Sequence, residues 1–189
     1  MPLHFVQIVY WLALSTWFGG VLFIALSAPI IFSTVRQSNP ILPTVLSVNL
    51  ENQHATLLAG SIVANLLGRL IRIELACAAV LLLALLAQWF LIDMSNRQNL
   101  VFALLRTALF AAAVVAVVYD WRVLWPRILR KREEYIEHAD EPDVANAAKD
   151  DFDRYHRESV TLLTVVLACL LGMVLFSASI ATARTMIEF

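Results

Sequence analysis

Four side chains of this sequence have the types needed for metal or haem chemistry: His54, Glu74, Asp120 and His156. Imidazole nitrogens and carboxylates bind zinc and copper, and histidine also binds haem iron. The chain has no phosphate loop, nucleophile elbow, paired-cysteine motif or HExxH motif. The histidines show no repeated ligand spacing. We therefore predict no catalytic residue and no cofactor or metal site, and keep His54 and His156 as ligands of an alternative haem or copper site.

Four apolar runs must position these side chains. The chain has 189 residues, of which 60% are hydrophobic, which is too apolar for an ordinary soluble domain. A transmembrane helix needs about 20 apolar residues. The runs predict membrane spans at about 5–31, 74–93, 100–120 and 159–183. The expected fold class is all-α, a polytopic membrane protein with one domain, 1–189, built as a four-helix transmembrane bundle in the lipid bilayer.

The segment 121–158 is predicted to form a helical hairpin between the third and fourth spans. Residues 120–158 hold nineteen of the chain's twenty-nine charged residues. Opposite charges recur at helical spacing, as in Asp150 and Arg154. Pro142 suits the first turn of a helix, so we expect the hairpin to turn near 139–142.

A second amphipathic element is predicted at 55–72, before the second span. Its apolar residues recur every four positions, beside a more polar stripe that includes Ser61 and Asn65. This periodicity is typical of a helix that lies at a membrane surface. We expect this surface helix to run directly into the second span.

The basic residues predict the orientation in the membrane. Eleven of the fourteen Lys and Arg residues lie in the two connections 32–74 and 120–159. By the positive-inside rule these connections are cytoplasmic, and the N and C termini lie outside. We expect an integral protein of a bacterial inner membrane.

Small residues mark candidate packing faces on the first and fourth spans. Small side chains let membrane helices approach closely. The residues concerned are Gly19, Gly20, Thr164, Ala168 and Gly172. The pattern fits packing inside the bundle and packing against another protein's helices equally well.

Arg106 is a charge inside the third span, and an unpaired charge there is costly. Spans two and three are joined by the short segment DMSNRQN, so they must be antiparallel neighbours. Gln88 and Asp93 then lie within reach of Arg106. We predict a structural arginine, with a functional site on the outer side as the alternative.

Three segments resemble the transmembrane protein 205-like family. They are WFGGVLFIALSAPIIF (17–32), AGSIVANLLGRLIRIE (59–74) and FDRYHRESVTLLTVVL (152–167), roughly a quarter of the chain. The resemblance implies a four-span fold with the topology given above.

That family is distantly similar to copper-resistance D-type membrane proteins and to a haem-binding protoporphyrinogen oxidase. Those relatives place a histidine in the first span, shortly before a Trp-x-Gly-like stretch. Here the stretch is Trp17 to Gly19, and Val9, Tyr10 and Trp11 occupy the region of the histidine. This difference argues against haem binding and oxidase activity.

The residues and the resemblance together favour a non-catalytic accessory or scaffold subunit of a larger membrane protein complex. Its expected partners are the lipid bilayer and other membrane protein subunits, and we expect no nucleic-acid partner. The alternative function is a haem- or metal-handling membrane protein of the copper-resistance D-like type.

Overall fold

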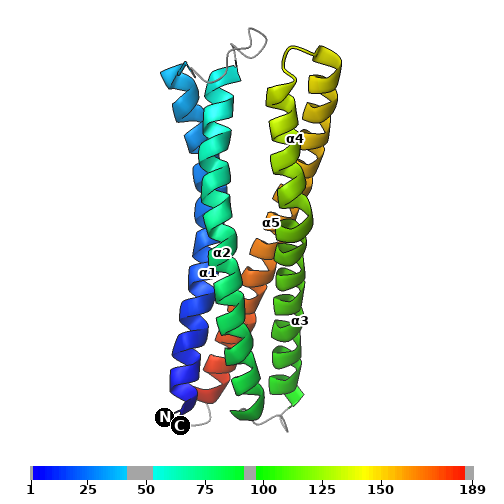
Figure 1. The fold of residues 1–189 in the computed structure, drawn as a ribbon. Helices are drawn as coiled ribbons and strands as arrows, with labels where there is room; N and C mark the ends of the chain where they lie inside the picture. Colours follow the sequence, from blue (N-terminus) through cyan, green and yellow to red (C-terminus); the bar gives the residue numbers. More distant parts are fainter. Residues whose placement is uncertain (1, 42–52, 92–96, 186–189) are drawn as a thin grey trace. The chain divides into compact units, whose positions relative to one another are not determined.

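Helices account for the structure of this protein, which we describe from a computed structural model. The structure describes residues 2–41, 53–91 and 97–185 and contains no strand within these ranges. Four helices are long and apolar enough to cross a membrane, which confirms the predicted all-α, four-helix membrane fold. The helices (Figure 1) are α1 Pro2–Ser38, α2 His54–Leu91, α3 Arg97–Tyr119, the π-helical turn η2 Asp120–Leu124, α4 Trp125–Glu137 and α5 Pro142–Thr185.

The first helix extends beyond the predicted span 5–31. Helix α1 continues through Pro29 to Ser38. Asn39 follows with a φ of 41°, and its N–H donates to the carbonyl of Arg36 at 3.4 Å. Asparagine tolerates this left-handed conformation better than most residues, so it ends the helix at low cost.

The predicted surface helix 55–72 and the second span are parts of one helix, α2. The last residues of that predicted span, 92–93, lie outside the described residues. Arg132 of α4 donates hydrogen bonds to the Leu57 carbonyl, at 3.0 Å, and to the Ser61 hydroxyl. One side of the 55–72 segment therefore packs against α4. Its location at a membrane surface stays a prediction.

A π-helical turn lets the chain continue past Pro126. Proline lacks an N–H, and within an α-helix its ring clashes with the carbonyl four residues earlier. In η2 each backbone hydrogen bond reaches five residues back instead of four. The N–H of Trp125 donates to the carbonyl of Asp120. Pro126 then stands in the first turn of α4, where a proline is tolerated.

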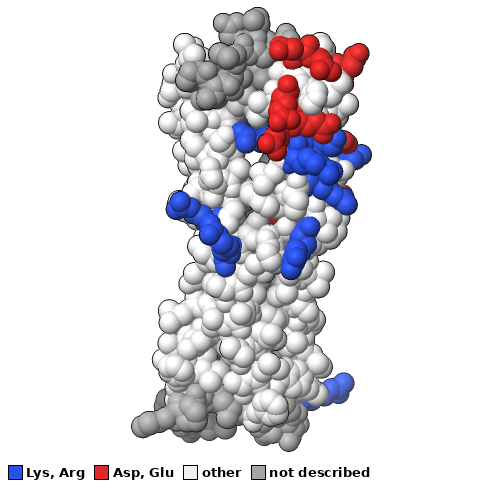
Figure 2. All heavy atoms as spheres, in the orientation of Figure 1, with Lys and Arg blue, Asp and Glu red and all other residues white. Residues whose placement is uncertain are grey.

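Helices α4 and α5 form the predicted hairpin, with the turn at residues 138–141. Lys131 contacts Asp151 of the facing helix at 3.3 Å and Glu134 of its own helix at 2.8 Å. Arg154 contacts Asp151 at 2.9 Å. The ion pairs therefore converge on Asp151 rather than on Asp150. Figure 2 shows acidic and basic side chains gathered over this hairpin, at the upper right of the view.

The chain divides into two compact units. The first contains Met1–Val21, Arg72–Val118 and Leu163–Phe189, and the second contains Leu22–Ile71 and Tyr119–Leu162. Helices α1, α2 and α5 contribute a segment to each unit. The core of the first unit includes the fully buried side chains Leu14, Trp17, Leu81, Leu170 and Met173.

The predicted packing residues differ in their surroundings. A Cβ added to Gly172 would lie 2.8 Å from Cδ1 of Leu109 in α3, so this glycine faces a neighbouring helix of the first unit. Thr164 and Ala168 are exposed. A Cβ added to Gly19 would meet no atom within 4 Å. The neighbouring Gly20 is half-buried. The Gly172 position thus packs closely against α3.

Candidate functional site

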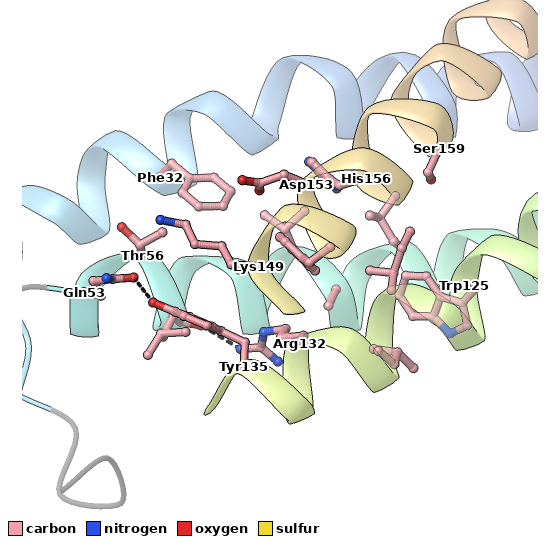
Figure 3. A pocket seen from close by; sticks show the side chains of 18 residues that line it. Phe32, Gln53, Thr56, Trp125, Arg132, Tyr135, Lys149, Asp153, His156 and Ser159 are labelled. Atoms are coloured by element: carbon pink, nitrogen blue, oxygen red, sulfur yellow. Dashed lines mark hydrogen bonds between the residues drawn. The ribbon is translucent and has the colours of Figure 1, made fainter. Parts of the chain in front are cut away.

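The second unit contains a cavity of about 270 Å³, shown in Figure 3. Helices α1, α2, α4 and α5 all contribute to its wall. Most of the lining is apolar and includes Leu57, Val63, Leu67 and Ile128. The polar and ionisable residues of the lining are Gln53, Thr56, Arg132, Tyr135, Lys149, Asp153, His156 and Ser159. An apolar chamber with a few polar groups is typical of sites for small organic molecules.

Two contacts of α4, one with Gln53 just before α2 and one with α2 itself, mark the two ends of the cavity. At one end the Tyr135 hydroxyl donates to Oε1 of Gln53 at 2.6 Å. At the other end the Trp125 ring lies 3.4 Å from where a Cβ on Gly68 would be. Tyr135 follows Trp125 by ten positions, which corresponds to about 15 Å along an α-helix. The cavity is therefore elongated along the helices, with a Gln53–Tyr135 end and a Trp125 end.

Helix α5 supplies the most polar wall. Lys149, Phe152, His156 and Ser159 recur at three- and four-residue spacing and all line the cavity. The Lys131–Asp151 ion pair fixes the register of α5 against α4. Lys149 consequently stands toward the Gln53–Tyr135 end, and Figure 3 shows its amino group directed toward Thr56.

His156 lies on the cavity wall, with its ring stacked on Phe152 at 5.7 Å between centroids and 4° between planes. The carboxylates of Asp153 and Asp120 both act on it electrostatically. Asp120 also interacts with the side chain of Ser159. His156 therefore lines the cavity, and part of its side chain is also exposed at the surface of the protein.

The structure brings together only some of the four candidate ligands named from the sequence. Asp120 and His156 lie near each other in the second unit. His54 is buried at the start of α2. Glu74 belongs to the first unit, where it accepts a hydrogen bond from the Trp17 indole at 3.1 Å. Among the described residues, no group of three His, Cys, Asp or Glu side chains could hold a metal ion.

Arg106 interacts with an aromatic side chain that the sequence did not suggest. It is 4% exposed, and its Cζ lies 5.6 Å from the centroid of the buried Tyr10 ring, whose hydroxyl is 2.7 Å from Ser177 Oγ. Gln88 could accept from Arg106 only through Oε1. In the described part of the chain that atom has no hydrogen-bond partner, so the predicted bond is not formed. Asp93 lies outside the described residues.

The cavity was not predicted from the sequence. Its signal is present in α5, where four cavity residues form one stripe through a highly charged helix. It is also present in α2, where Leu57, Gly60 and Leu67 follow a helical period. Comparison of the chain with protein-family models, curated proteins and solved structures found no match.

Proposed function

We propose that this membrane protein binds one small amphipathic molecule in the cavity of its second unit, without catalysis. The observation that carries the proposal is the cavity itself, a chamber of about 270 Å³ with a mostly apolar wall and a few polar groups. Binding sites for small molecules commonly combine an apolar surface with a few oriented polar groups.

The lipid bilayer sets the energetics of such a site. Burying a methylene group from water stabilises a complex by about 0.8 kcal/mol. The alkyl chain of a ligand that moves from the bilayer into the cavity gains little of this free energy, because lipid tails are already apolar. Selection therefore depends on shape and on the polar groups, among them Tyr135, Arg132 and Lys149. A site of this kind holds or presents a molecule and needs no reactive residue.

The test is equilibrium binding of a radiolabelled twelve-carbon amphiphile to the full chain in lipid nanodiscs. Detergents with dodecyl chains must be absent, because they would compete. We expect saturable binding of one molecule per chain above the partition of the probe into empty nanodiscs. Binding that never exceeds the partition into empty nanodiscs would refute the proposal.

We further propose that the hairpin of α4 and α5 is cytoplasmic, that both termini lie outside, and that the membrane is a bacterial inner membrane. Eleven of the fourteen basic residues lie in the connections 32–74 and 120–159, which supports this orientation.

Cysteine labelling in intact cells tests this orientation. A cysteine replacing the exposed Glu141 in the hairpin turn should react with an impermeant maleimide only after the cells are permeabilised. The matched control is Arg97→Cys, at the exposed start of α3, which should react without permeabilisation. Cys77 and Cys169 are buried and should give little background. The opposite pattern of labelling would reverse the topology.

A second candidate function is the accessory or scaffold role in a larger membrane complex. Thr164 and Ala168 expose small side chains on a membrane helix, which favours close approach of another helix. Membership of the transmembrane protein 205-like family, proposed from sequence resemblance, is compatible with both roles. Haem or copper handling by His54 and His156 is a third hypothesis.

A further inference from the structure

We infer that the cavity selects a single-chain amphiphile with an anionic head, bound with the head at the Gln53–Tyr135 end and the chain toward Trp125. This inference rests on the proposed function and adds the class of ligand and its direction. It is drawn from the charges of the lining, the polar atoms at one end and the length of the cavity.

The charges on the cavity wall are predominantly positive. The lining includes two cationic side chains, Arg132 and Lys149, and one carboxylate, Asp153, which lies beside His156. Both acceptors that Arg132 contacts, the Leu57 carbonyl and the Ser61 hydroxyl, are neutral. Lys149 takes part in none of the ion pairs found among the described residues. The wall thus carries cationic charge that its own carboxylate does not balance, and an anionic group would balance it.

Neutral polar groups gather at the same end as Lys149. The Tyr135 hydroxyl and Gln53 amide are joined by a hydrogen bond of 2.6 Å, and Thr56 lies beside them on α2. The Gln53 amide nitrogen, the Thr56 hydroxyl and the Lys149 ammonium can all donate hydrogen bonds. Donors around an ammonium group are suited to the oxygens of a carboxylate or phosphate head.

The opposite end is suited to an alkyl chain. Leu67, Ile128 and the Trp125 ring line it. The helical rise gives a length of about 15 Å between the two ends of the cavity. In an extended alkyl chain each C–C bond of about 1.5 Å advances the chain by about 1.3 Å, so this length accommodates roughly twelve carbons. A cavity of 270 Å³ lies near the lower limit of ligand sites, which favours one chain over two.

The experiment compares three twelve-carbon probes in nanodiscs: dodecanoate, dodecyl phosphate and the uncharged 1-dodecanol. We expect the wild-type chain to bind at least one of the two anions about tenfold or more tightly than dodecanol, since hydrogen bonds to charged groups are strong. The tighter anion identifies the head group. Lys149→Gln should remove most of that preference, because the anions lose an ion pair that dodecanol never makes, and Lys149→Arg should retain it.

The control is Arg130→Gln, which removes one positive charge from an exposed position of α4 that does not line the cavity. It should leave all three affinities unchanged. Equal binding of dodecanol and both anions by the wild-type chain would overturn the inference and leave the proposed function standing. Absence of saturable binding of every probe would instead overturn the proposed function.

Discussion

Gly60→Leu is expected to lower the affinity for the bound amphiphile at least tenfold without unfolding the protein. Gly60 lines the cavity, and a Cβ added there would meet no atom within 4 Å. A leucine side chain can therefore enter the cavity without a clash at its first atom and occupy space that the ligand needs. Glycine costs about 1 kcal/mol in a helix relative to a good helix former, so the helix itself should become more stable.

Gly19→Leu is the matched control. It makes the same substitution in a helix, at a position where an added Cβ again meets nothing within 4 Å, but Gly19 does not line the cavity. We expect wild-type affinity in the nanodisc binding assay. If Gly60→Leu binds as tightly as Gly19→Leu, the amphiphile is held elsewhere.

Gly172→Leu is expected to lower the free energy of unfolding by about 1–3 kcal/mol, the usual cost of overpacking. The added Cβ would come within 2.8 Å of Cδ1 of Leu109, and the rest of the leucine must also displace α3 or α5. The end of the Leu109 side chain can rotate, so Gly172→Ala should cost much less. Thermal unfolding in one fixed detergent measures both variants.

Ala168→Leu separates internal packing from partner binding. Ala168 is exposed one helical turn from Gly172, so its substitution should leave the unfolding temperature near the wild-type value. If the scaffold role is correct, Ala168→Leu should also reduce co-purification of a membrane partner. An unfolding temperature lowered as far as by Gly172→Leu would contradict the packing described for this face.

The helices could be predicted because their physical causes are local. Runs of apolar residues have only a few stable forms in a membrane, and the α-helix satisfies every backbone group within the run. Pro142 begins α5 as predicted, because proline suits the first turn. The continuity of 55–72 with the second span was also predicted, but the packing of this segment against α4 was not, because that contact joins residues far apart in the chain.

The contacts of the candidate site could not be predicted, because they join residues far apart in the chain. Tyr10 was passed over as the partner of Arg106, since an aromatic residue nearly one hundred positions away carries no sequence signal for this contact. The cavity likewise depends on the register of α5 against α4, which the Lys131–Asp151 pair fixes. Lys149 and His156 line the cavity although both are exposed, and the sequence of one helix does not show what packs beside it.

The location of a bound alkyl chain tests the proposed cavity site most directly. Dodecanoate with a diazirine at its terminal carbon would be cross-linked to the protein in nanodiscs, and the modified residues identified by mass spectrometry. The account predicts adducts at the Trp125 end of the cavity, on Trp125, Leu67 or Ile128. Adducts confined to exposed apolar residues of α1, such as Phe23 and Leu26, would show a chain dissolved in surrounding lipid and would contradict it.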